Sequence, residues 1–106
     1  MDITLERLDD IESNGIIVET PEVSLARPEF VIGRADDCHL QIPSRFVSRH
    51  HCELIVDERD RQVRVRDLGS QNGTFVNDNM VTDECEVRDG DRIRVACIPF
   101  EIHIGH

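Results

Sequence analysis

The chain has 106 residues, of which 39% are hydrophobic and 32% are charged. This length fits one domain and is too short for two hydrophobic cores, and the composition excludes an intrinsically disordered chain. The formal net charge of −10 argues against nucleic acid and anionic membranes as partners. One small basic pocket is still compatible with this charge, because charges beyond a Debye length of about 8 Å are largely screened.

Short apolar alternations predict strands in the first half of the chain. Residues 3–8 and residues 15–20 both have strand-like patterns, and the second segment is rich in β-branched side chains. Residues 19–29 contain two prolines, which are confined to sheet edges and strand ends, so we predict a loop or an edge segment there. Two further short strands are predicted at residues 30–32 and 39–42.

Regular alternation also marks the second half of the chain. Residues 52–56, 62–66, 92–95 and 100–104 place apolar side chains on one face of a strand. Asn-Gly and Asp-Gly pairs between these segments are signals for tight turns. No window has the period of a helix, and short strands separated by turns predict an all-β sandwich or barrel.

The four cysteines, at positions 38, 52, 85 and 97, show no CxxC spacing. The acidic, amphipathic start of the chain is unlike a secretory leader, and no apolar run is long enough to span a membrane. We therefore expect free thiols in the reducing cytoplasm. A disulfide pair in a secreted domain is the alternative, because the number of cysteines is even.

Side chains that could bind a metal gather around the middle of the chain, at Cys38, His39, His50, His51 and Cys52. Their types suit zinc, but neighbouring residues of a strand point to opposite faces and do not converge on one ion. We therefore predict no metal site and no cofactor. A metal- or thiol-dependent regulatory domain that uses Cys38, Cys52 and the histidines is a remote alternative.

Residue patterns typical of enzymes do not stand out. His51 and Cys52 are adjacent, so the same strand geometry separates them as a base and a nucleophile. No pair of carboxylates stands out from the acidic background, and the phosphate-cradling GxxxxGK motif is absent. We expect no catalytic activity.

Polar side chains that suit an oxyanion lie in three predicted loops. Arg34 follows a strand-ending glycine, Ser48-Arg49 precedes a strand, and Gln71-Asn72 lies on a tight turn. A guanidinium makes paired charge-assisted hydrogen bonds to an oxyanion, and a hydroxyl satisfies a further lone pair. Each loop alone could be an ordinary solvated loop. Loops at strand ends can, however, converge at one end of a sandwich and form an exposed anion pocket.

Four motifs, in their order and separations, resemble the forkhead-associated (FHA) domain family: Gly33-Arg34, Ser48-Arg49-His50-His51, Ser70-Gln71-Asn72-Gly73-Thr74 and Asp89-Gly90-Asp91-Arg92-Ile93. Each motif is weak alone, but the four together are specific. The resemblance covers roughly residues 30–104, and residues 1–29 would add amino-terminal strands and a loop, so we expect one domain over residues 1–106. It implies a two-sheet antiparallel β-sandwich of the FHA/SMAD-like type, whose loops at one end bind phosphothreonine peptides.

The resemblance also assigns roles to the loop residues. It implies that Arg34 and Ser48 contact the phosphate and that Arg49 makes a further phosphate or peptide contact. Asn72 would hold the peptide backbone just after the phosphothreonine. Gln71 stands where the family often has Ser or Thr on the phosphate; an amide still donates hydrogen bonds, but its reach differs.

Other positions would support the site. His51 would tie one binding loop to the next, and Gly33, Gly73 and Thr74 would be framework residues. Phe46, in the loop of the second motif, has two interpretations. It is either a loop anchor in the core or a surface residue that contacts the peptide beside the phosphothreonine.

We predict a phosphothreonine-dependent protein interaction module of Ser/Thr-kinase signalling, without enzymatic activity. Its partner would be a phosphothreonine-containing protein or peptide, and neither nucleic acid nor a membrane. We expect a cytoplasmic monomer. The alternative is an FHA-like domain that binds an unphosphorylated protein surface as a scaffold, for which Gln71 leaves room.

Overall fold

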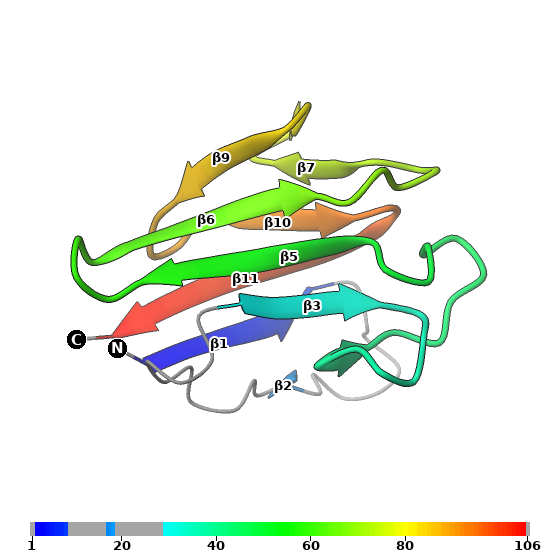
Figure 1. Cartoon of the computed structure of the whole chain (residues 1–106), viewed down its shortest axis with the longest axis horizontal. Coiled ribbons are helices and arrows are strands. Elements are labelled where there is room, and N and C mark those ends of the chain that lie inside the picture. The colour runs from blue at the N-terminus through cyan, green and yellow to red at the C-terminus, as the bar shows by residue number, and fades with distance from the viewer. Residues whose placement is uncertain (1, 9–16, 19–28, 106) are drawn as a thin grey trace.

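The computed structural model describes residues 2–8, 17–18 and 29–105. These residues form eleven strands in two sheets and contain no helix (Figure 1). In the described part of the chain there is accordingly no helix that is long and apolar enough to cross a membrane. The predicted all-β sandwich of two sheets is confirmed.

One sheet contains six strands. In spatial order they are β2 (Ile17–Val18), β1 (Asp2–Arg7), β11 (Ile98–Gly105), β10 (Arg92–Val95), β7 (Thr74–Val76) and β8 (Asn79–Met80). All pairings in this sheet are antiparallel. Strand β1 pairs with β11 along its whole length, with Ile3 opposite Ile104. The first and last described strands therefore lie side by side within this sheet.

The other sheet contains five strands. In spatial order they are β4 (Leu40–Gln41), β3 (Glu29–Gly33), β5 (Cys52–Asp57), β6 (Gln62–Asp67) and β9 (Glu84–Val87). It differs from the predicted antiparallel arrangement in one short parallel pair, β3–β4, in which Ile32 lies opposite Leu40. The pair is parallel because residues 34–39 turn the chain back far enough for β4 to run beside the end of β3 in the same direction.

Two predicted segments are only partly described. Strand β2 lies within the predicted strand at residues 15–20, and the rest of that segment is outside the described residues. The predicted loop or edge segment at residues 19–29 also lies outside them, apart from Glu29, which opens β3.

Aliphatic side chains and two phenylalanines fill the space between the sheets. Phe30 of β3 and Phe100 of β11 are each 1% exposed. On β6 the buried Val63 and Val65 alternate with polar side chains, and Arg64 between them is exposed. The period-2 pattern of the sequence therefore identified the core face of this strand correctly.

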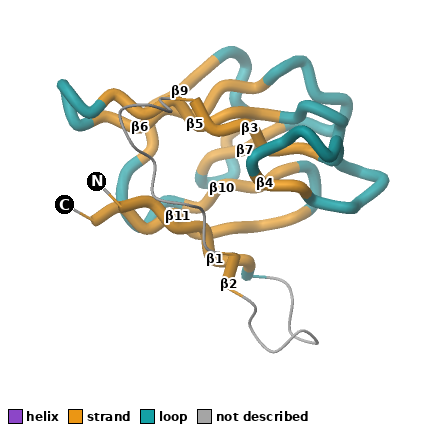
Figure 2. Tube along the Cα trace, turned by 60° about the horizontal axis from the view of Figure 1, so that its bottom comes forward, coloured by secondary structure: helices purple, strands orange, loops and turns teal. Residues whose placement is uncertain are grey.

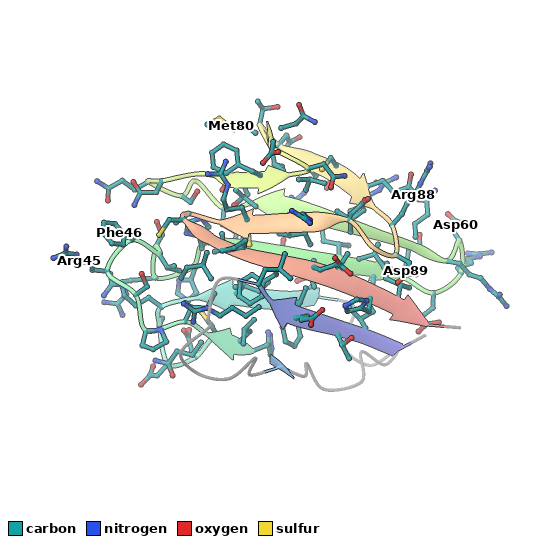
Figure 3. The ribbon with its side chains drawn as sticks, turned by 180° about the vertical axis from the view of Figure 1, so that it is seen from behind. Arg45, Phe46, Asp60, Met80, Arg88 and Asp89 are labelled. Carbon is teal, nitrogen blue, oxygen red and sulfur yellow. The ribbon has the colours of Figure 1, made fainter. Side chains whose placement is uncertain are left out.

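The topology brings three loops to the same end of the sandwich. Strands β3 and β6 end there, and strands β5 and β7 begin there (Figure 1, right). Figure 2 shows the same crowded end from a second direction, away from the labelled termini. Arg45 and Phe46 lie at this end, and Asp60, on the hairpin between β5 and β6, lies at the opposite end (Figure 3).

Leu54 lies on the central strand β5, and its side chain is 0% exposed. Leu54→Ala should lower the free energy of unfolding by about 3 kcal/mol, because the core cannot fully collapse onto the cavity. Denaturant titration measures the loss. The control is Leu68→Ala, since Leu68 is 37% exposed and its truncation should cost less than about 1 kcal/mol. Equal losses for the two variants would contradict the position of Leu54 in the core.

Candidate functional site

Three neighbouring loops form the candidate site. The 34–39 loop follows β3, the 42–51 loop joins β4 to β5, and the 68–73 loop joins β6 to β7. Together they contain all the residues that the sequence predicts to contact a phosphopeptide. Hydrogen bonds between the loops bring these residues into one place.

Backbone hydrogen bonds hold the 34–39 loop against the 42–51 loop. The amide of Arg34 donates to the carbonyl of Ser48 over 2.9 Å, and the amide of Ala35 donates to the carbonyl of Arg49 over 3.0 Å. Gly33 permits this close approach, because a Cβ at its position would overlap the carbonyl oxygen of Arg49. Any side chain at Gly33 would therefore force the two loops apart.

The guanidinium of Arg34 is fixed at one nitrogen and open at the other two. Its Nε donates to the carbonyl of Val47 over 3.1 Å, and Val47 is itself 1% exposed. Among the described residues the two terminal nitrogens have no hydrogen-bond partner, and the residue is exposed. The fold thus sets the direction of this side chain and leaves the outer edge of its donor fork free for a ligand.

The hydroxyl of Ser48 links the second loop to the third. It accepts a hydrogen bond from the backbone amide of Gln71 over 3.0 Å, which leaves the hydroxyl proton free to turn toward a ligand. Gln71 therefore contributes through its backbone, a role for which the sequence carries no signal. Its side chain is exposed, and a contact between that side chain and phosphate stays a prediction.

His51 makes a second link between the same two loops. Its ring is 0% exposed. Nδ1 accepts a hydrogen bond from the amide of Ser48 over 3.0 Å, and Nε2 lies 2.8 Å from the carbonyl oxygen of Gly73. Because a carbonyl only accepts, Nε2 must carry the proton, and the ring is the neutral tautomer with a bare Nδ1.

His50 and His51 both precede β5 and differ in burial, because the ring of His51 is buried and the side chain of His50 is on the surface. Nε2 of His50 lies 2.9 Å from a carboxylate oxygen of Asp37. The hydrogen bond with the imidazole holds the pKa of Asp37 below its ordinary value, and the charge of Arg49 acts in the same direction. Asp37 has no distinguishing signal in the sequence, because only the turn of the 34–39 loop places it opposite His50.

Asp67, at the end of β6, organises the 68–73 loop. One carboxylate oxygen accepts hydrogen bonds from the amides of Gly69 and Ser70, and the other accepts them from the hydroxyls of Ser70 and Thr74. Burial alone would raise the pKa of Asp67, but the four hydrogen bonds outweigh burial and lower it. The sequence signal that was missed is an Asp before Gly and Ser, which is typical of side-chain-capped turns.

Asn72 makes a third link between the loops. Its Nδ2 donates to the carbonyl of Phe46 over 2.7 Å. The ring of Phe46 is 47% exposed, and the guanidinium carbon of Arg45 lies 5.0 Å from its centre (Figure 3). The interpretation of Phe46 as a core anchor is therefore wrong, because its backbone faces the neighbouring loop while its ring lies on the surface.

The cysteines do not form disulfides. All four are free, so the alternative of a disulfide pair is wrong for this structure. Cys52 is 0% exposed, and burial raises the pKa of its thiol to about 12. It is therefore not a reactive thiolate at neutral pH.

Two groups of side chains among the described residues could each offer three ligand atoms to a metal ion. One consists of Asp37, Cys38 and His50, and the other of Glu6, Glu101 and His103. The second group contains two carboxylates that pair with the imidazole of His103 on the surface of the six-stranded sheet. The first group lies beside the three loops.

The FHA domain family model matches residues 30–96, and the chain belongs to this family. The chain is 40% identical over 76 residues to the human E3 ubiquitin-protein ligase CHFR, a match that covers 69% of this chain and 11% of CHFR. It is 32% identical over 80 residues to the FHA domain-containing protein FhaB of Mycobacterium tuberculosis, and this match covers 76% of this chain and 50% of FhaB.

A solved structure extends the likeness to the whole chain. It comes from a structural and functional analysis of phosphothreonine-dependent FHA domain interactions. The two chains are 29% identical, with a TM-score of 0.80 and coverage of 100% of this chain and 99% of that one. By contrast, the chain spans about a tenth of CHFR and half of FhaB, so both relatives contain sequence beyond the match.

Asp67→Asn should lower the free energy of unfolding by about 2 kcal/mol at pH 7, because an amide NH₂ would face groups that donate to the carboxylate. The pKa of Asp67 is lowered in the folded state. Its carboxylate therefore stabilises the fold fully above the ordinary aspartate pKa of about 3.9, and this contribution is lost as the pH falls through the folded value.

Denaturant titrations across pH measure the difference between wild type and variant. The difference should be constant from about pH 6 to pH 8 and should narrow below about pH 4. Asp60→Asn is the control, because it removes the same charge from an exposed position and should change stability by less than about 0.5 kcal/mol. A difference for Asp67→Asn that matches this control at pH 7 would refute the role of the carboxylate.

Proposed function

We propose that the chain binds phosphothreonine-containing peptides at the three-loop site. The observation that carries the proposal is a pair of aimed donors: the open guanidinium edge of Arg34 and the free hydroxyl proton of Ser48. The backbones of these two residues are hydrogen-bonded to each other, so both donors can serve one ligand group. A phosphoryl group carries about −1.5 to −2 charges and three acceptor oxygens, which suits such a pair.

Arg49 would supply a second cation to the phosphate or to the peptide. It is exposed and directly follows Ser48 on the same loop. Its carbonyl is fixed by the amide of Ala35, while its charge acts on Asp37. A bound phosphate would compete with Asp37 for this guanidinium and, with its greater charge, would draw it toward the pocket.

The remaining loop residues would contact the peptide beyond the phosphate. Asn72 uses one amide N–H for the carbonyl of Phe46. Its Oδ1 has no partner among the described residues, so it could accept a hydrogen bond from the peptide backbone. The exposed ring of Phe46 offers apolar surface to a flanking side chain. Gln71 would add a side-chain amide near the phosphate.

The likeness to FHA domains supports a binding role rather than a catalytic one. The 29% identical solved domain was studied for phosphothreonine-dependent interactions. The match to CHFR covers only 11% of that ligase, so its ligase activity is not part of the proposal. We assign to this chain a non-catalytic module in Ser/Thr-kinase signalling. Its four free thiols favour the reducing cytoplasm.

A scaffold function without phosphate is the second candidate. The observation in its favour is the exposed Phe46 ring with Arg45 stacked on it, since exposed aromatic and arginine side chains often anchor protein interfaces. The two candidates differ in their dependence on Arg34, because only a phosphate needs its open guanidinium edge.

Arg34→Ala should reduce the affinity for a phosphothreonine peptide by about 100-fold or more, because it removes charge-assisted hydrogen bonds worth about 3 kcal/mol in total. Calorimetric titration with peptides selected from an oriented library measures this loss. Arg59→Ala is the matched control: it removes the same charge from an exposed position on the hairpin at the opposite end of the sandwich and should leave the affinity unchanged.

The unphosphorylated form of the same peptide completes the test. Wild-type protein should bind it far more weakly than the phosphorylated form. Equal affinity for both forms, with no effect of Arg34→Ala, would reject phosphate recognition and favour the scaffold function.

Acidic residues beside the phosphothreonine should weaken binding at low salt, because the protein carries a net charge of −10. A series of phosphothreonine peptides with acidic, neutral and basic flanks measures the effect. The spread of affinities should shrink as salt is added, since the Debye length falls from about 30 Å at 0.01 M to about 10 Å at 0.1 M. Affinities that do not depend on peptide charge at low salt would contradict this expectation.

A further inference from the structure

Asp37, Cys38 and His50 form a cluster of potential metal ligands beside the three-loop site. A carboxylate oxygen, the thiol sulfur and an imidazole nitrogen all lie within 4.8 Å of one another. The prediction of no metal site covered Cys38 and His50 together with His39, His51 and Cys52, and the buried His51 and Cys52 indeed take no part in this cluster. Asp37 is the new member of the set, and it joins Cys38 and His50 because the turn of the 34–39 loop places it opposite His50.

The donor types suit zinc. A thiolate, an imidazole and a carboxylate are the three kinds of side chain that bind this ion, at about 2.0–2.3 Å. A tetrahedral ion with such bonds separates its ligand atoms by about 3.3–3.8 Å. The imidazole nitrogen and the nearest carboxylate oxygen are 2.9 Å apart, so these two atoms would move slightly apart to admit the ion. Both side chains are exposed.

The charges around the cluster favour a cation. The carboxylates of Asp37 and Asp36 place negative charge near the sulfur of Cys38. The positive charge of Arg49 acts on Asp37. A bound ion would therefore face two carboxylates and one guanidinium, and its fourth coordination position would remain open to water.

The cluster joins the two loops that carry Arg34 and Ser48. Asp37 and Cys38 lie on the 34–39 loop, and His50 lies on the 42–51 loop. The thiol of Cys38 donates to the carbonyl of Arg49 over 3.1 Å, so the sulfur already lies where the 34–39 loop contacts the 42–51 loop. An ion held here would replace one weak hydrogen bond and one exposed ion pair with three coordination bonds.

We propose that Asp37, Cys38 and His50 bind one zinc ion that links the 34–39 loop to the 42–51 loop. On binding, the thiol of Cys38 loses its proton to solvent and its sulfur bonds to the ion. Nε2 of His50 gives up the proton that it donates to Asp37, the neutral ring carries its proton on Nδ1, and both side chains exchange their mutual hydrogen bond for bonds to the ion. The oxidation state of every atom is unchanged.

Cobalt(II) is the optical probe for this site, because it adopts zinc-like coordination and gives a charge-transfer absorption band when a thiolate binds it. Titration of the whole chain with cobalt should produce this band in wild type and in Cys97→Ser, which removes an exposed thiol outside the cluster. The band should be lost in Cys38→Ser and weakened at least tenfold in apparent affinity in His50→Gln. Zinc should then displace the cobalt.

Neither Cys38→Ser nor His50→Gln should unfold the protein, because serine retains a hydrogen-bond donor at position 38 and His50 is exposed. Thermal melts of the metal-free variants check this. A wild-type protein without the band, or an unchanged band in folded Cys38→Ser, would overturn the proposal.

The site also has a consequence that rests on the proposed function. A zinc ion would neutralise Asp37 and fix the two loops that carry the phosphate donors, so it should raise the affinity for a phosphothreonine peptide several-fold. The same titration with Cys38→Ser should show no effect of zinc. If wild-type protein binds cobalt but no phosphopeptide, the metal site is supported and the proposed function is rejected. If it binds phosphopeptides but no cobalt, the proposed function is supported and the metal site is rejected.

Discussion

The three-loop end of the sandwich depends on the hydrogen bonds of the buried His51. The backbone amide of His51 donates to the carbonyl of Ile32 on β3, and the backbone carbonyl of His51 accepts from the amide of Leu68 at the start of the 68–73 loop. Its ring accepts from Ser48 and donates to Gly73. The polar groups of this one residue are thus all hydrogen-bonded, to partners on β3, in the 42–51 loop and in the 68–73 loop. Parting the loops would leave buried polar groups unpaired, each at a cost of about 1–3 kcal/mol, which is why the loops stay together without a ligand.

This arrangement prepares the site for a small, highly charged ligand. Arg34 is already directed by its hydrogen bond to Val47, and the hydroxyl oxygen of Ser48 is already held by the amide of Gln71. Because little conformational freedom remains to be lost, most of the electrostatic attraction can appear as affinity. The positive charge is local, set on a protein whose net charge is −10, so recognition depends on a few aligned donors and not on the overall field.

The sequence predicted the sandwich well because strands carry a period that reports burial, as the alternation of Val63, Arg64 and Val65 shows. The loops that gather at one end could be predicted from family motifs. How they hold each other could not, because contacts between loops have no period. The backbone role of Gln71, the exposure of Phe46 and the meeting of Asp37 with His50 all depend on the tertiary path of the chain.

Amide correlation spectra recorded during titration with one threonine peptide, in phosphorylated and unphosphorylated forms, test phosphate recognition most directly. If the three-loop site binds phosphate, the amides of Ser48, Gln71 and Asn72 will shift with the phosphopeptide, and a phosphatase added to the sample will reverse the shifts. Amides of the hairpin at residues 57–61, at the opposite end of the sandwich, will stay in place. Equal shifts with the unphosphorylated peptide, or shifts confined to the 57–61 hairpin, would contradict phosphate recognition at the three-loop site.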